Sequence, residues 1–146
     1  MKQSSTIKIV LWVAAGVVAG YVVWWLILEY LRKNEDPRSS TRLSRIAAEL
    51  NRSVPVMIDS ETELMPVQST EGVLIYNYLL VNYSAAQINR DKFAAGAKLR
   101  LSQNACNTAE TRDDFLKKGV SLRFTYYDKD KQYIATVDVT PADCAR

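Results

Sequence analysis

The feature that most constrains this chain is a run of twenty uncharged residues, 9–28, close to its N-terminus. A helix of that length rises about 30 Å, which matches the hydrocarbon thickness of a bilayer. Aromatic residues, which favour the headgroup region, lie near both ends of the run: Trp12, Trp24, Trp25 and Tyr30. The run therefore predicts a single transmembrane helix over residues 9–31, preceded by a short N-terminal tail, 1–8.

A cleavable signal peptide is the alternative interpretation of the same run. Lys2 and Lys8 provide a basic start, and residues 18–20, Val-Ala-Gly, could pass as a cleavage site. However, the apolar run continues past that site to Leu28, whereas a cleaved segment normally becomes polar there. A retained helix is the favoured interpretation, so the membrane bilayer is the first expected partner.

Gly16 and Gly20 are four residues apart within the predicted span. Small residues at this spacing let two helix backbones approach closely, which supports helix association in membranes. Glycine is also frequent in membrane helices that have no such role. Gly16 and Gly20 are therefore candidate helix-packing residues, and a homodimer through the transmembrane helix is a hypothesis.

The chain after the span divides by charge. Residues 32–54 carry six basic and three acidic residues, whereas residues 55–146 carry eleven basic and twelve acidic ones. Basic side chains beside a span usually snorkel to the interface, and they can also attract anionic headgroups. We expect a basic linker with a short amphipathic helix over 32–54 and one folded domain over 55–146. Because that domain is near neutral, no nucleic-acid partner is expected.

Local patterns predict the elements after the span. Helical spacing and capping residues indicate helices at 43–50, from about 91 to 104, and from 107 to 119. Alternation and apolar content indicate extended segments at 56–58, 62–67, 72–83, 120–126 and 133–139. The order of these elements predicts an α+β fold, with a small antiparallel sheet and helices packed on one face.

The residue types available for chemistry exclude most enzyme classes. The chain has no histidine, the commonest general base and transition-metal ligand. It has neither a CxxC pair nor a phosphate-binding glycine loop, so no metal, no cofactor and no catalytic residues are expected. Asp59, Glu61 and Glu63 alternate and would share one side of an extended strand. A carboxylate-dependent hydrolase could use them, but a solvated edge strand is the favoured interpretation.

Tyrosines mark the candidate binding surface. Tyr76 and Tyr78 share one face of the expected central strand, and Tyr126 lies on a strand of its own. A tyrosine-lined sheet face can bind peptide or glycan by stacking and hydroxyl contacts. Ordinary packing between strands is the more common role of such residues.

Signals for the orientation of the chain disagree. More basic residues follow the span than precede it, which favours a cytoplasmic C-terminal domain. Cys106 falls between two expected helices and Cys144 follows the last expected strand, positions that suit a cross-link. A buried reduced pair is the ordinary alternative, so the two thiols alone do not identify an oxidising compartment.

Several segments resemble small, uncharacterised bacterial membrane-anchored envelope proteins with a C-terminal two-cysteine α+β domain. They are ELNRSVPVMIDSETEL, YNYLLVNYSAAQIN, NAC and GVSLRFTYYDKDKQYIATVDVTPADC, within residues 49–144. The family has no established activity and contributes no catalytic residues. The resemblance implies a single-pass inner-membrane protein with its domain in the periplasm. Cys106 and Cys144 would then lie outside the cytoplasm, where we expect them to form a disulfide.

These inferences favour a non-enzymatic binding or accessory protein that contacts another envelope protein. A subunit of an envelope machine, an immunity protein and an exclusion factor all fit this description. An envelope domain that binds glycan or peptide is the alternative, and a carboxylate-dependent hydrolase is less favoured.

Overall fold

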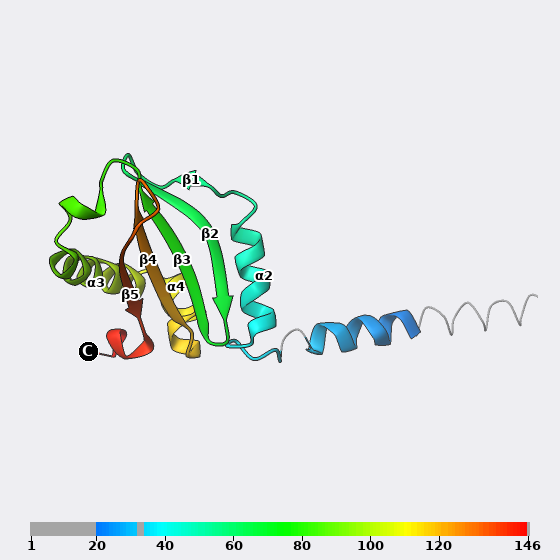
Figure 1. Ribbon diagram of the computed structural model, residues 1–146. Helices are drawn as coiled ribbons and strands as arrows, with labels where there is room; N and C mark the ends of the chain where they lie inside the picture. Colours follow the sequence, from blue (N-terminus) through cyan, green and yellow to red (C-terminus); the bar gives the residue numbers. More distant parts are fainter. Residues whose placement is uncertain (1–19, 32–33, 146) are drawn as a thin grey trace, which may run out of the picture. The chain divides into compact units, whose positions relative to one another are not determined.

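The computed structural model describes residues 20–31 and 34–145 (Figure 1). The chain divides into two units between Glu35 and Asp36. In the first unit, residues 20–31 are helical and their apolar side chains are exposed. Within the described ranges, no helix has both the length and the apolar character needed to cross a membrane. Residues 9–19 of the predicted span, Gly16 among them, lie outside the described residues. Gly20 is described and is exposed.

The second unit contains a five-stranded sheet with the strand order β1-β2-β3-β4-β5. Its strands are β1 (Val56–Met57), β2 (Thr62–Thr70), β3 (Val73–Leu80), β4 (Ser121–Asp128) and β5 (Tyr133–Val139). Strands β3 and β4 are parallel, whereas the other neighbouring pairs are antiparallel. The expected antiparallel sheet is therefore wrong at its centre. The chain between β3 and β4 crosses over through helices, which brings it back to the same end of the sheet.

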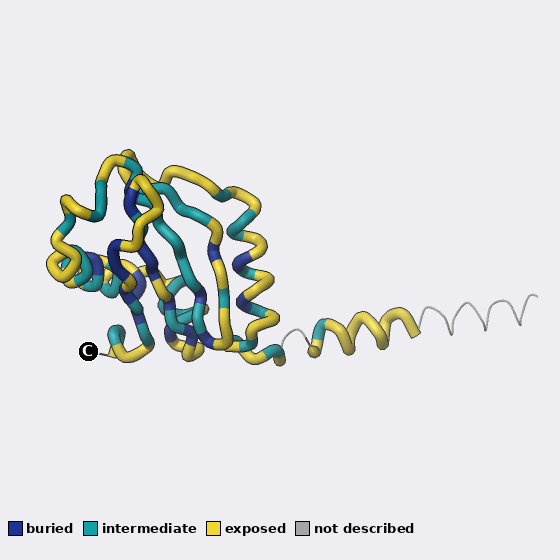
Figure 2. The backbone as a smooth tube through the Cα atoms, viewed as in Figure 1, coloured by how far each residue is buried: buried dark blue, intermediate teal, exposed yellow. Residues whose placement is uncertain are grey.

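Helices cover one face of this sheet, so the α+β class is confirmed. They are α2 (Ser40–Leu50), α3 (Arg90–Asn107), α4 (Ala109–Asp114) and the 3-10 turns η1 (Ala85–Gln87), η2 (Leu116–Lys118) and η3 (Pro141–Cys144). Figure 1 shows α2 alongside β2, and α3 packs against β5. Figure 2 shows that the buried residues concentrate in the strands and on single sides of the helices.

The amphipathic helix α2 packs on the folded domain. Its N-terminus is capped by Ser39, whose side chain accepts a hydrogen bond from the backbone N–H of Arg42. Leu43 and Ala47 are buried on its inner side. At its C-terminal end, the Asn51 side chain donates to the Val67 carbonyl at 2.8 Å and accepts from the Val67 N–H at 2.7 Å. The Asn51 side-chain amide therefore makes the same two hydrogen bonds with Val67 that the backbone of a neighbouring strand would make.

Helix α3 begins where capping chemistry predicts, since the Asn89 side chain accepts from the Lys92 N–H at 3.0 Å. It continues to Asn107 and ends at Thr108, whose extended backbone also opens the short helix α4. Cys106 therefore lies within the last turn of α3. The expected helix from 107 to 119 forms in part, as α4 and the 3-10 turn η2, and it ends at Gly119 as predicted. Cys106 is bonded to Cys144, with 5.3 Å between their Cα atoms, which ties α3 to η3.

Two glycines and one arginine organise the turns that precede β3 and β4. Gly72 in this turn and Gly119 after η2 have φ angles of 71° and 79°, a region that favours glycine. The Gly72 N–H donates to the Arg38 carbonyl at 2.8 Å, and the Gly72 carbonyl accepts from the Ser121 N–H at 2.8 Å. The Arg38 side chain lies over both glycines, because a Cβ on either would come within 3.3 Å of it.

Candidate functional site

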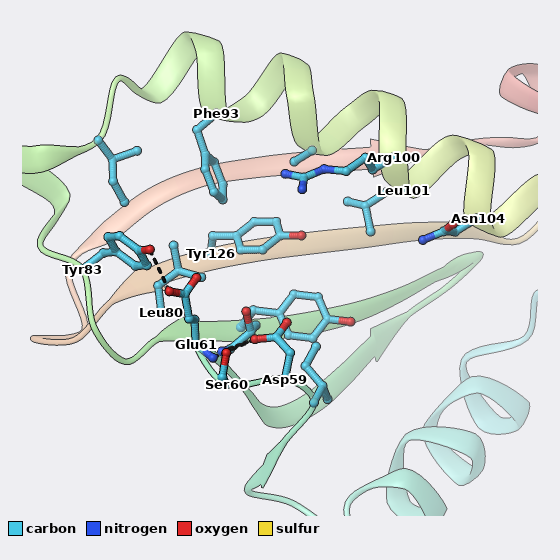
Figure 3. Close-up of a pocket in the computed structure, with 15 residues that line it drawn as sticks. Asp59, Ser60, Glu61, Leu80, Tyr83, Phe93, Arg100, Leu101, Asn104 and Tyr126 are labelled. Atoms are coloured by element: carbon cyan, nitrogen blue, oxygen red, sulfur yellow. Dashed lines mark hydrogen bonds between the residues drawn. The ribbon is translucent and has the colours of Figure 1, made fainter.

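A groove of about 680 Å³ lies on the helical side of the sheet, between α3 and the loop from β1 to β2 (Figure 3). Tyr78, Leu80 and Tyr126 contribute from the strands. The other lining residues come from the two walls and from the end near η1: Ile58, Asp59, Ser60, Glu61, Thr62, Tyr83, Ile88, Phe93, Ala97, Arg100, Leu101 and Asn104. The groove is thus assembled from segments far apart in the sequence.

A second cavity, of about 260 Å³, continues the groove along the sheet. It shares Tyr78, Leu101 and Asn104 with the first cavity. It also reaches Tyr76 and Phe124. The two cavities together form one surface, which we call the aromatic groove, with its floor on β3 and β4 and one wall on α3.

The floor of the aromatic groove is a cluster of rings. The parallel pairing of β3 with β4 sets Tyr76 opposite Phe124 and Tyr78 opposite Tyr126, and ring centroids in both pairs are 5.3 Å apart. Phe93 from α3 meets Tyr126 edge-on, at 4.9 Å between centroids. The structure thus brings together the three tyrosines that the sequence singled out. It adds Phe124 and Phe93, which sequence reasoning did not connect with them.

The tyrosine hydroxyls of the floor remain available as donors. Burial raises the pKa of Tyr126 to about 12 and also raises the pKa of Tyr78, so both phenols are protonated at neutral pH. In the described part of the chain, neither hydroxyl has a hydrogen-bond partner, although both rings line the groove. An apolar floor that carries free hydroxyls suits a ligand with both apolar and polar groups.

The loop wall opposite α3 is held by its own hydrogen bonds. Asp59 accepts from the N–H groups of Glu61 and Thr62, each at 2.8 Å, and the Glu61 hydrogen bond is the main reason that its pKa is lowered. Glu61 in turn accepts from the Tyr83 hydroxyl at 2.9 Å (Figure 3). Both carboxylates therefore stabilise the mouth of the groove.

The three alternating carboxylates do not converge, which corrects the expectation that they share one side. Strand β2 begins only at Thr62, so Asp59 and Glu61 lie in the preceding turn, where a period of two does not apply. Glu63 pairs with Leu79, while its neighbour Leu64 pairs with Tyr78. Glu63 consequently points to the face away from the groove. Across the described ranges, no group of three or more His, Cys, Asp or Glu residues is placed to hold a metal ion.

The other predicted site residues lie elsewhere. The disulfide borders a separate cavity of about 410 Å³ beside α3 and η3, which Lys98, Leu99 and Asp143 also line. Lys98 pairs with Asp143 there at 2.6 Å. Of the two glycines expected to pack helices in the membrane, only Gly20 is described, and it belongs to the first unit.

Comparison with known proteins identifies the fold. A scan of protein-family models and a search of characterised proteins give no match. Among solved structures, a candidate secreted protein of Pseudomonas aeruginosa is similar with a TM-score of 0.62 and 19% identity, over 72% of this chain and 91% of that one. EpsS, the pilotin of the Vibrio vulnificus type 2 secretion system, has a TM-score of 0.60 and 19% identity, over 73% and 92%.

A third similar structure is AspS, the type II secretion system pilotin of Vibrio cholerae. Its TM-score is 0.57 at 13% identity, over 78% of this chain and 99% of that chain. Since all three structures are nearly fully covered, the domain described here corresponds to their whole fold. At these identities the likeness concerns the fold alone.

Proposed function

We propose that this chain is a non-enzymatic accessory protein of the bacterial envelope whose C-terminal domain binds a helical segment of another envelope protein. The aromatic groove is the observation that carries this proposal, because its ring floor, partly buried at Tyr76 and Tyr78 and buried at Phe124 and Tyr126, lines a groove between α3 and the loop wall. Two of the similar structures are named pilotins of type II secretion systems. A pilotin-like role is therefore the specific form of the proposal.

A helix suits the aromatic groove better than an extended peptide does. Strands β3 and β4 each have a neighbour on both sides, so their backbone groups are already paired. An extended peptide lying on the rings would gain no main-chain hydrogen bonds, whereas a helix satisfies its own. The five residues of β3 from Tyr76 to Leu80 span about 13 Å, which corresponds to roughly two to three helical turns.

Attachment to the inner membrane is part of the proposal. The helical residues 20–31 carry Trp24, Trp25 and Tyr30 with more than half of each residue exposed, as expected for a helix that contacts lipid. The Cys106–Cys144 bond suits an oxidising compartment, which supports a periplasmic domain. We propose a single-pass anchor with the domain in the periplasm, and a homodimer through Gly16 and Gly20 stays a prediction.

Site-specific photo-crosslinking tests the binding function in cells. The full-length chain would carry a benzophenone amino acid at Asn104, which is exposed and lines the groove. The matched control carries it at Gln103, the adjacent exposed residue, which lines the cavity on the other side of α3. We expect Asn104 alone to give an adduct with one envelope protein, mapped by mass spectrometry to an amphipathic helix. Equal adducts from both positions, or adducts with lipid only, would contradict the proposal.

A further inference from the structure

We propose that Arg100 forms a carboxylate-binding subsite in the aromatic groove, which selects a partner helix bearing an Asp or Glu beside its apolar stripe. This inference rests on the proposed function, since it specifies the chemistry of the bound helix. It assigns to Arg100 a role in specificity, while the rings of the floor supply the apolar contact.

Arg100 is a basic residue without a partner. It is exposed on α3 and is the one Lys or Arg among the described residues that line the two cavities. No carboxylate of the described ranges lies within 4 Å of it as an ion pair. Six other basic residues of the domain have carboxylate partners: Arg52, Lys98, Arg112, Lys117, Lys118 and Arg123. Several exposed ones, such as Arg90 and Lys92, form no ion pair among the described residues either, but they do not line the groove.

The loop wall does not supply the missing carboxylate. Asp59 and Glu61 line the groove opposite α3 (Figure 3), but they accept hydrogen bonds from the loop backbone and from Tyr83. A guanidinium presents five N–H donors in a planar fork, which matches a carboxylate. The carboxylate that would pair with Arg100 is therefore expected on the bound helix.

Neighbouring groups around Arg100 are also donors. Its positive charge lowers the pKa of Tyr126, against the larger effect of burial, which indicates that the guanidinium lies near that hydroxyl. Figure 3 shows both side chains reaching into the same part of the groove. Asn104 is four residues after Arg100 and so lies on the same side of α3. A carboxylate bound there would contact the guanidinium of Arg100, the amide of Asn104 and the hydroxyl of Tyr126. On the opposite wall, the negative charges of Asp59 and Glu61 would repel a second anion.

A peptide array provides the test. The probes are amphipathic helical peptides of about 14 residues, in which a single Glu is moved through successive positions beside a leucine stripe. Each Glu peptide has a Gln twin and a Lys twin. Binding to the full-length chain in detergent micelles is measured by fluorescence anisotropy. At the best position, we expect the Glu peptide to bind roughly tenfold more tightly than its Gln twin, as for one charge-assisted contact.

Variants at position 100 identify the source of this preference. Arg100→Gln should remove the difference between the Glu and Gln twins, and Arg100→Glu should shift the preference to the Lys twin. The matched control is Arg90→Gln, which removes the same charge from an exposed position of α3 outside the groove and should keep the preference.

Two outcomes separate this inference from the proposed function. If Glu and Gln twins bind equally well to the unaltered chain, or if Arg100→Gln keeps the preference, the subsite is refuted while helix binding stands. If no peptide of the array binds, helix binding in the groove is refuted, and the subsite with it.

Discussion

Asp128 is a buried carboxylate that joins two loops at the end of β4, with 2% of the residue exposed. Its Oδ2 accepts from the Ala85 N–H at 2.8 Å, and its Oδ1 accepts from the N–H groups of Asp130 and Gln132 at 2.9 and 2.7 Å. These hydrogen bonds, led by that from Ala85, hold its pKa below the usual range. Its charged form therefore stabilises the fold.

We expect Asp128→Asn to lower the melting temperature at neutral pH. Because the folded-state pKa is lowered, the stabilisation is complete above the ordinary value of about 3.9 and is lost as pH falls through the folded value. The difference in melting temperature between the unaltered chain and Asp128→Asn should therefore become smaller below about pH 4. Circular dichroism melts across this range measure it, with the exposed Asp130→Asn as the control. A difference that does not change with pH would contradict the electrostatic origin.

At the scale of elements, the turn between β2 and β3 depends on Gly72. An alanine there must adopt a positive φ, which costs about 1–2 kcal/mol. Its Cβ would also lie 3.2 Å from Arg38 Nε. We expect Gly72→Ala to destabilise the domain by at least this amount in chemical denaturation.

Gly96 provides the matched control for that change. It lies in the middle of α3, and a Cβ placed on it has no atom within 4 Å apart from its chain neighbours and the backbone of its own helix. Gly96→Ala should stabilise the protein by about 0.5–1 kcal/mol, because alanine loses less backbone entropy in a helix. Equal effects of the two substitutions would show that the turn does not require a positive φ.

Local chemistry predicted the elements better than it predicted their pairing. The cap at Asn89 and the alternation in 133–139 are signals within a few residues, and both elements form there. The direction in which β3 pairs with β4 depends on a crossover of about forty residues, which no local period records. Helix α3 runs three residues past its expected end at about 104. The bond from Cys106 to Cys144 joins distant segments, so no local pattern places Cys106 within that last turn.

At the scale of the whole molecule, the candidate site was only partly predictable. Tyr76 and Tyr78 alternate on one strand, so their common face follows from the sequence. Phe93 and Arg100 reach the same groove from α3, and only the packing of α3 over β4 and β5 brings them there. The sequence thus indicates the floor of the groove. The α3 wall, whose Arg100 would select for charge, can be recognised only from the folded structure.

The location of the whole molecule is testable through its disulfide. In the chain-entropy model, a bond that closes a separation of 38 residues stabilises the domain by about 4 kcal/mol, and it persists only where the surroundings are oxidising. We expect Cys106 and Cys144 to resist a thiol-alkylating reagent in denatured extracts of intact cells and to react after prior reduction. In spheroplasts, protease added outside should degrade the domain. Thiols that react without reduction, together with a domain protected from that protease, would place the domain in the cytoplasm. That is the orientation that the basic residues after the predicted span favour.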